Sequence, residues 1–258
     1  MKVSAEIIST GREILMGEIV NTNSAWIAKF LTKLGFKVRR ITTVGDEVDE
    51  VAKAVKEAIN RGNLVVIVTG GLGPTPDDTT AEALARALGR PLRLNEEALR
   101  MIEEKCKQRG VEVTEFRRKM AYLPAGGRPL PNPIGMAPGI KVEERGTLIL
   151  ALPGVPKEAY AMFTENVLPV LKEISQGLGF VFKKYLIRGV LEADVAPLLR
   201  EITNGGHGLY IKTRVTRGGL ELILARWTLE GREGGLERVE EELIKELKER
   251  GAEVEKLQ

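Results

Sequence analysis

The sequence predicts an α/β protein: a three-layer sandwich with a mostly parallel sheet, followed by a small α+β domain. Two observations predict this class. Through the first 110 residues, short β-branched runs alternate with segments whose apolar residues recur at helical spacing, an order that builds a parallel sheet covered by helices on both faces. Beyond residues 176–179 the order becomes strand, helix, strand, strand, helix. We therefore expect two domains, residues 1–177 and 178–258.

Three strands and four helices are predicted before residue 110. The helix around Trp26 ends at Gly35, and the next two helices end at Gly62 and Gly89, because glycine readily takes the left-handed conformation that closes a helix. Asn95 caps the fourth helix. The strands are expected at 5–9, 36–44 and 64–68, and the helices at 24–34, 48–59, 80–88 and from 96 onward.

The rest of the first domain is predicted to be less regular. Residues 123–139 are rich in Pro and Gly and are expected to form an ordered loop. The segments 139–143 and 147–152 can pair as a hairpin, and a helix at 157–174 follows the next tight turn. In the second domain, strands are expected at 181–190, 209–215 and 220–229, and helices at 192–202 and 235–250.

Composition excludes several classes of protein. The 39 basic and 36 acidic residues give a formal net charge of +3, so no nucleic-acid partner is expected. No signal peptide and no membrane-spanning run is recognisable, so we expect no membrane partner. A single cysteine, Cys106, and a single histidine exclude an intrachain disulfide and a Cys/His zinc site, and indicate the cytoplasm. Abundant Glu, Lys and Arg with little Gln are typical of a thermophile.

The stretch from 63 to 80 carries the prediction of function. It reads NLVVIVTGGLGPTPDDTT: a buried strand, a glycine loop, two carboxylates and a helix capped by Thr79, with Glu82 at capping-box spacing. Exposed amides and the positive end of a helix attract phosphate, and Asp77 and Asp78 can hold a divalent cation. The glycines match neither the P-loop nor the dinucleotide-binding pattern. From the glycines alone, a structural turn explains the loop as well as a phosphate site does.

Polar residues also follow the first two strands. Glu13, Asn21 and Asn23 come after the first strand, and Asp46 follows the second. The carboxyl ends of parallel strands meet at one edge of the sheet, where α/β proteins bind their ligands. These residues can therefore join the glycine loop in a ligand site. The alternative is that the first three are solvated loop residues and that Asp46 is a turn residue.

Three other features favour a structural interpretation. His207 lies in a glycine-rich turn, and Cys106 lies on the apolar face of a helix. The segment 231–234, GREG, matches the G-x-x-G of RNA-binding KH domains, but it follows a strand and carries an acid that would repel phosphate. We expect an incidental histidine, a core cysteine and a turn.

Several stretches resemble the competence/damage-inducible CinA family. They are TGREIL at 10–15, GEIVNTN at 17–23, TTVGD at 42–46, GGLGPTPDDTT at 70–80, PNPIGMAPG at 131–139 and LPGVP at 152–156. They occur in the family's order and cover roughly residues 1–175. The same domain occurs in molybdenum-cofactor proteins of the MoaB, MogA and MoeA type, where it binds molybdopterin.

The resemblance implies a molybdopterin-binding fold, followed by a small KH-like domain. The nicotinamide-nucleotide deamidase domain of long CinA proteins has no room in this chain. The first domain is similar to one described as an ADP-ribose pyrophosphatase that needs a divalent metal (Mg, Mn or Co). Relatives with this domain form dimers or trimers, so a homo-oligomer is expected. One residue departs from the family: Arg12 stands where an aspartate is usual, which removes a carboxylate and adds a positive charge.

Three functions remain open at this point. The first is a metal-dependent hydrolase that cleaves ADP-ribose or a related nucleotide diphosphate. The metal would be held by Asp77 or Asp78, with a further ligand from Glu13 or Asp46, and it would activate a water. The second is a molybdopterin-binding protein acting in adenylylation, metal insertion or transport. The third is a non-catalytic nucleotide-binding protein. The expected catalytic residues are Asp77 and Asp78, and the expected phosphate- or nucleotide-binding residues are Gly70, Gly71, Leu72, Gly73, Pro74, Thr75, Asn21, Asn23, Pro153, Gly154 and Lys157.

Overall fold

The chain divides into two compact units. The computed structural model describes residues 3–204, 209–229 and 236–257. The first unit holds Met1–Thr32 and Phe36–Ile174, and the second holds Lys33–Gly35 and Ser175–Gln258. The main division therefore falls between Ile174 and Ser175.

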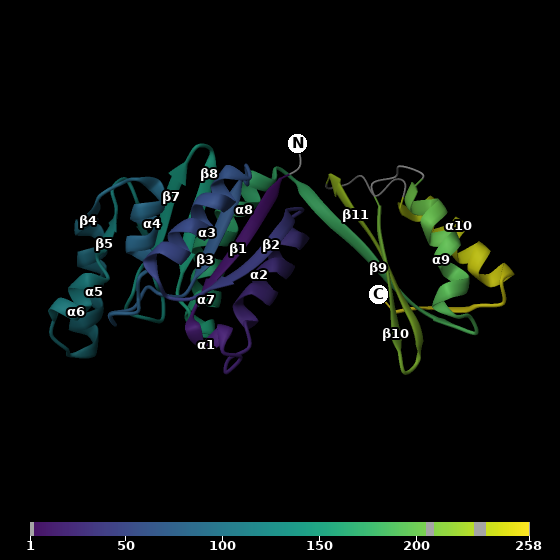
Figure 1. Cartoon of the computed structure of the whole chain (residues 1–258), viewed down its shortest axis with the longest axis horizontal. Helices are drawn as coiled ribbons and strands as arrows, with labels where there is room; N and C mark the ends of the chain where they lie inside the picture. Colours follow the sequence, from purple (N-terminus) through teal and green to yellow (C-terminus); the bar gives the residue numbers. More distant parts are fainter. Residues whose placement is uncertain (1–2, 205–208, 230–235, 258) are drawn as a thin grey trace. The chain divides into compact units, whose positions relative to one another are not determined.

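A six-stranded sheet forms the centre of the first unit (Figure 1). Its strands are β1 (Ser4–Thr10), β2 (Lys37–Val44), β3 (Val65–Thr69), β6 (Arg128–Leu130), β7 (Gly139–Glu144) and β8 (Thr147–Leu152). Their order is β2-β1-β3-β8-β7-β6. The first four strands run parallel, β7 pairs antiparallel with β8, and β6 pairs antiparallel with β7. The mostly parallel sheet and the β7–β8 hairpin are confirmed. A two-stranded ribbon of β4 (Leu92–Leu94) and β5 (Tyr122–Pro124) was not predicted.

Helices cover both faces of this sheet, which confirms the three-layer sandwich. The helices are α1 (Arg12–Leu15), α2 (Thr22–Lys33), α3 (Val48–Asn60), α4 (Thr80–Leu88), α5 (Glu96–Arg109), α6 (Glu115–Lys119), α7 (Pro156–Met162) and α8 (Leu168–Ser175). On one face, α3, α4 and α5 share a buried core with Ile8. Ile7, its neighbour in β1, is equally buried. Its side chain lies on the other face of the sheet, because successive strand residues point to opposite sides. On that side, α2 meets the segment after α7 through Trp26 and Phe163, whose ring centroids lie 5.2 Å apart.

The predicted helix at 157–174 is interrupted. A π-helical turn, η1 (Phe163–Val167), separates α7 from α8. Pro169, in the first turn of α8, has no N–H to donate to the carbonyl of Glu165, and its ring crowds that carbonyl. A locally widened turn relieves this conflict without ending the helix.

A buried ion pair joins β1 to the start of β3. Glu6 is fully buried in β1. Arg61 donates from Nε to Glu6 Oε1 at 2.9 Å and from Nη2 to Oε2 at 2.7 Å, and Asn63 Nδ2 donates to Oε1 at 2.8 Å. The hydrogen bond with Glu6 is the largest cause of a raised pKa at Arg61. This fork fixes the turn between α3 and β3 against the neighbouring strand.

The second unit is a four-stranded antiparallel sheet with two helices. Its elements are β9 (Leu178–Arg188), α9 (Glu192–Asn204), β10 (Leu209–Thr216), β11 (Gly219–Leu229), α10 (Leu236–Glu249) and β12 (Glu253–Lys256), with strand order β10-β11-β9-β12. This confirms the small α+β unit, although the last strand was missed. His207 and the segment 231–234 lie outside the described residues. No helix within the described ranges has the length and apolar character needed to cross a bilayer.

Glu240 connects α10 to β9 in the second unit. Lys183 and Tyr185 both donate a hydrogen bond to its carboxylate. Burial acts to raise the pKa of Glu240, but the hydrogen bonds from Lys183 and Tyr185 outweigh it, and the pKa is lowered. Burial, aided by the bond to Glu240, raises the pKa of Tyr185.

We expect Arg61→Met to lower the free energy of unfolding of the first unit by about 3 kcal/mol, because a buried carboxylate would lose its charged partner. Denaturant unfolding in a Trp227→Phe background follows Trp26, the one remaining tryptophan. The control is Arg40→Met, an exposed arginine of β2, which should change the value by less than about 0.5 kcal/mol. Equal losses in both variants would contradict the prediction.

The stability of the second unit should fall in acid because of Glu240. Its folded-state pKa lies below its ordinary value, so the carboxylate stabilises the fold above that value, and the stabilisation is lost as the pH drops through the folded-state pKa. Unfolding at pH 7 and pH 3, followed by Trp227 in a Trp26→Phe background, should show a smaller pH dependence in Glu240→Gln. Glu237→Gln, an exposed position of the same helix, should keep the full dependence.

Candidate functional site

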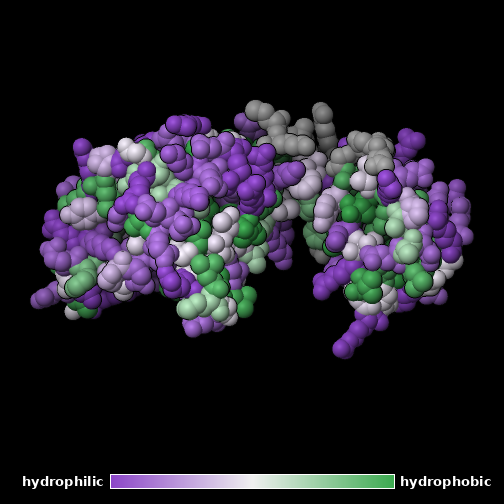
Figure 2. Space-filling view, in the orientation of Figure 1, coloured by the Kyte–Doolittle hydropathy of each residue, from purple (hydrophilic) through white to green (hydrophobic). Residues whose placement is uncertain are grey.

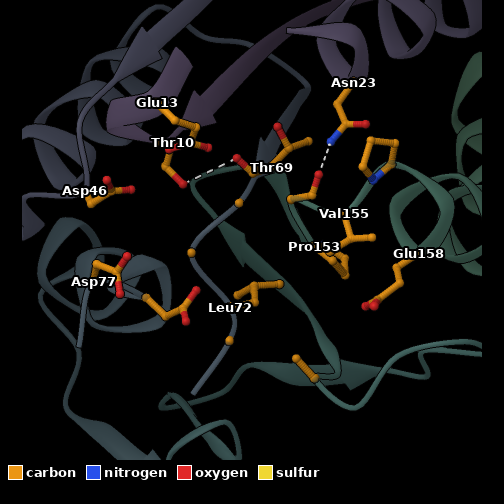
Figure 3. Close-up of a pocket in the computed structure, with 18 of the residues that line it drawn as sticks. Thr10, Glu13, Asn23, Asp46, Thr69, Leu72, Asp77, Pro153, Val155 and Glu158 are labelled. Carbon is orange, nitrogen blue, oxygen red and sulfur yellow. Dashed lines mark hydrogen bonds between the residues drawn. The ribbon is translucent and has the colours of Figure 1, made fainter. Parts of the chain in front are cut away.

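A cavity of about 730 Å³ lies at the carboxyl ends of β1, β3 and β8 (Figure 3). Thr10 and Thr69, the last residues of β1 and β3, and Pro153, which follows β8, form its floor. The predicted site residues that line it are Glu13, Asn21, Asn23, Asp46, Gly70, Gly71, Leu72, Gly73, Pro74, Asp77, Asp78, Pro153 and Gly154. Thr75 and Lys157 do not line it. The shared edge inferred from the strand order therefore exists.

Gly70 and Gly71 turn the chain sharply as it leaves β3. Their φ angles are +105° and +64°, values that favour glycine. A Cβ on Gly70 would stand 2.5 Å from the carbonyl oxygen of Thr10, and a Cβ on Gly71 would stand 2.5 Å from Thr80 Oγ1. The amide of Gly70 donates to the carbonyl of Leu152 at 3.0 Å. These two glycines bring the loop against three strand ends.

The next part of the loop leaves its amides free. Within the described residues, the N–H groups of Gly71, Leu72 and Gly73 donate to no acceptor. Thr75 differs: its amide and its hydroxyl both donate to Asp78 Oδ2, at 2.9 and 2.6 Å. The prediction for Thr75 is therefore corrected, since its amide is already paired and it stands outside the cavity. Three free amides remain, and consecutive amides of this kind bind anions.

Asp77 and Asp78 have different roles in the structure. Asp78 accepts the bonds that close the turn at Thr75. Asp77 is exposed, and its pKa is lowered, first by the nearby Thr75 hydroxyl, then by its own backbone amide and by the charge of Lys119. Asp77 is thus ionised at neutral pH and open to a ligand, whereas Asp78 holds the loop.

The helix after the loop does not supply the anion site. Thr79 precedes α4 but makes no capping bond to it; its hydroxyl donates instead to the carbonyl of Asp46 at 2.5 Å. The predicted capping box with Glu82 is therefore wrong: Thr79 has helical rather than extended backbone angles, φ −110° and ψ −2°, so its hydroxyl is not placed to accept from the first turn. Thr80 donates its hydroxyl to the Gly70 carbonyl at 2.8 Å, which anchors the loop without lining the cavity.

Two other helices point their first turns at the cavity. Asn21 caps α2 by accepting from the amide of Ser24 at 3.1 Å, and Asn23 donates to the carbonyl of Gly154 at 2.8 Å, just before α7 (Figure 3). Thr22, Asn23, Val155 and Pro156 all line the cavity. The positive ends of α2 and α7 therefore face it, and they favour an anionic ligand.

The four carboxylates predicted to bind a metal do not form a ready-made cage. Among the described residues, no group of three or more His, Cys, Asp or Glu side chains is close enough to hold an ion. Asp46 accepts the amide of Arg12 at 2.9 Å, and Glu13 folds over Gly11. The guanidinium of Arg12 pairs with Glu47 at the surface and does not enter the cavity.

Sequence reasoning missed one wall of the cavity. Met136 and Ala137 line it from the Pro-rich loop, Arg109 from the end of α5, and Glu158 from α7. Arginines and glutamates on helices are usually solvated, so the positions of Arg109 and Glu158 in the sequence do not indicate a binding site. The one available signal was the motif at 131–139, which positions this wall but was not assigned a role.

An apolar surface segment adjoins the cavity. Leu15, Met16, Ile19 and Val20 are each more than half exposed. Figure 2 shows hydrophobic residues gathered at the surface where α1 and the segment after it lie in Figure 1.

Fold and cavity together define an α/β protein with a cavity of small-molecule size at the edge of its sheet. Residues 6–173 match a family described as "probable molybdopterin binding domain". Protein PAE0875 of Pyrobaculum aerophilum is 49% identical over 213 residues, which cover 83% of this chain and 80% of that protein. A protein of Pyrobaculum arsenaticum is 44% identical over 263 residues and 98% of both chains. The chain therefore belongs to the molybdopterin-binding domain family.

A solved structure supports the resemblance to CinA. The CinA protein of unknown function from Thermoplasma acidophilum is 43% identical, with a TM-score of 0.60, over 63% of this chain and 95% of that chain. The molybdopterin biosynthesis enzyme MoaB of Thermus thermophilus is 25% identical, with a TM-score of 0.47, over 67% of this chain and 94% of that chain. The similarity to CinA is thus confirmed for the first unit. The KH-like character of the second unit stays a prediction.

We expect Gly71→Ala to destabilise the first unit more than Gly62→Ala. Both glycines have left-handed φ angles, +64° and +69°, but a Cβ at Gly62 has nothing within 4 Å, while one at Gly71 meets Thr80. Gly62→Ala should cost about 1 kcal/mol, from the backbone alone, and Gly71→Ala clearly more. Denaturant unfolding measures both values, and equal costs would show that the loop does not depend on close packing against Thr80.

Proposed function

We propose that this chain binds molybdopterin, or a closely related pterin phosphate, with the phosphate on the amides of Gly71, Leu72 and Gly73. The observation that carries the proposal is that these amides line the cavity and have no acceptor within the described chain. The positive ends of α2 and α7 add to the attraction for an anion. A volume of about 730 Å³ is within the range of small-molecule sites and accommodates a fused ring with its phosphate-bearing arm.

Membership of the family supports this choice of ligand. The family is described by its binding of molybdopterin, and its match spans the strands and loops that build the cavity. Adenylylation of the pterin, metal insertion or a carrier role would all use the same phosphate loop. The proposal is therefore specific about the ligand and its phosphate contacts and leaves the subsequent step to experiment.

A second candidate, cleavage of ADP-ribose or a related nucleotide diphosphate, is favoured by Asp77. This residue is an ionised, exposed carboxylate at the cavity beside the free amides. Asp77, with Asp78, would hold a Mg²⁺, Mn²⁺ or Co²⁺ ion that neutralises phosphate charge and activates a water. The amides of the glycine loop would orient the diphosphate, and Asn23 would hold the loop after β8 against it.

The expected homo-oligomer remains part of the proposal. Leu15, Met16, Ile19 and Val20 form an exposed apolar segment, and such segments commonly cover one another between copies. A dimer or trimer, measured by light scattering, is the expected state.

Pterin binding is the first test of function. The full chain, purified from a host that makes molybdopterin, should carry pterin that is detected by fluorescence after oxidation. Gly71→Ala should lose most of it, because the loop amides move, while Asp49→Asn, an exposed carboxylate outside the cavity, should retain it. A wild-type protein that carries no pterin, and that binds no inorganic pyrophosphate when it is added, would contradict the proposal.

Hydrolysis is tested separately. With ADP-ribose and Mg²⁺, Mn²⁺ or Co²⁺, the second candidate requires that AMP appear and that Asp77→Asn lower the rate at least about tenfold, a typical effect of removing a catalytic group. Asp49→Asn is again the matched control. If the protein binds pterin but forms no AMP from ADP-ribose with any of the three metals, the binding function stands and this hydrolysis is excluded.

A further inference from the structure

Glu158 is an acidic residue of the cavity that takes part neither in the phosphate loop nor in the turn at Thr75. It lies in the first turn of α7 and is half-buried. It lines the cavity on the other side of Leu72 from Asp46 and Asp77 (Figure 3). A carboxylate so placed is remote from the acidic side of the glycine loop and faces the opposite end of any ligand bound there.

Asn132 fixes one oxygen of this carboxylate. Its Nδ2 donates to Glu158 Oε2 at 2.8 Å and to the carbonyl of Ala137 at 2.9 Å, while its Oδ1 accepts from the amides of Ile134 and Gly135 at 3.1 and 2.7 Å. All four hydrogen-bonding positions of the amide are filled, so only one orientation of Asn132 is compatible with its surroundings. Asn132 is 5% exposed, which makes it a rigid support.

The space around Glu158 is shaped to receive it. A Cβ at Gly135 would overlap the Glu158 carboxylate, so the absence of a side chain there gives the carboxylate its position. The second oxygen, Oε1, has no hydrogen-bond donor and no cationic partner among the described residues. Oε1 is therefore free to accept a hydrogen bond from a ligand.

We propose that Glu158 selects the ring of the ligand by accepting two parallel hydrogen bonds from a 2-amino-4-oxopyrimidine edge, as found in pterin and guanine. This inference rests on the proposed function, because it places the ring at the end of the cavity away from the phosphate loop. The edge carries a ring N–H and an amino group side by side, which matches the two oxygens of a carboxylate. Oε2 can accept such a bond beside that from Asn132, since each carboxylate oxygen has two lone pairs.

The same geometry rejects adenine. The adenine edge offers one amino group next to a ring nitrogen that is itself an acceptor, and this nitrogen would face Oε1, also an acceptor. Met136 and Ala137 line the same wall and provide apolar surface for a flat ring. The carboxylate therefore acts as a specificity residue, and Asn132 as its positioning residue.

A structural role for Glu158 has to be distinguished from this one. An acid in the first turn of a helix is favoured by the helix dipole whether or not a ligand binds. A structural residue would alter stability when changed, but it would not alter the choice between rings. Glu158→Gln separates the two roles, because Asn132 donates and so keeps the glutamine oxygen towards itself, which turns the glutamine NH₂ to the ligand side. An oxygen beside an NH₂ complements adenine and opposes guanine.

The test is calorimetric titration of the full chain with GDP, ADP, IDP and inorganic pyrophosphate. The wild type should bind GDP at least about tenfold more tightly than ADP, as one good bidentate base contact provides, with IDP, which lacks the amino group, in between. Glu158→Gln should reverse the order of GDP and ADP and leave pyrophosphate binding unchanged. Glu165→Gln, an exposed glutamate of η1 outside the cavity, should behave as the wild type.

The outcomes separate this inference from the proposed function. Equal binding of GDP and ADP by the wild type, or a Glu158→Gln variant that keeps the wild-type order, would overturn the ring assignment. Binding of pyrophosphate in the same experiment would still support the phosphate site at the glycine loop. Failure of pyrophosphate to bind, with the GDP-to-ADP reversal intact, would overturn the phosphate assignment alone. No binding of any probe would overturn both.

Discussion

The tight turn of Gly70 and Gly71 is the constraint on which the site depends. Both residues have positive φ angles, and both approach neighbouring atoms so closely that a side chain would overlap them. The Gly70 amide donates to the end of β8, and Thr80 binds the carbonyls of Gly70 and Gly71 at 2.8 and 3.0 Å. The ends of β3 and β8 and the start of α4 therefore converge on two residues without side chains. The Gly70 amide is used in this way, whereas the amides of Gly71, Leu72 and Gly73 have no acceptor among the described residues.

The sheet supports this turn with polar groups at its buried edge. The hydroxyl oxygen of Ser9 lies 2.7 Å from that of Ser24 and 3.2 Å from that of Thr69. It also accepts a hydrogen bond from Asn21 Nδ2 at 3.0 Å. These bonds tie β1, β3 and α2 together below the cavity, and a fully paired network is rigid. The cavity is thus built on strand and helix ends, which hold a ligand more firmly than loops alone. Under the proposed function, the glycine loop binds the phosphate, and the opposite wall, with Glu158, binds the ring.

Much of this architecture could be predicted, because its signals are local. Helical periodicity and β-branched runs gave the elements of both units, and Asn95 caps α5 as expected, accepting from the amide of Ala98 at 2.9 Å. Predictions failed where a distant group competed. The hydroxyl of Thr79 was expected to cap its own helix and bonds Asp46 instead. Pro169 was read as part of a regular helix, but the missing N–H widens the turn before it.

The sequence by itself determined the fold class, the glycine loop and the set of polar residues at the sheet edge. The order of strands and helices along the chain, and the residues of each turn, are local features of the sequence. Tertiary structure decided what those residues can do. It used Asp78 to close a turn, left Asp77 ionised and open, and turned the side chain of Arg12 to the surface. It also brought Asn132 to Glu158 across 26 positions of sequence. The reason is physical: a hydrogen-bonding group takes the partner that packing brings nearest, and that partner comes from anywhere in the chain.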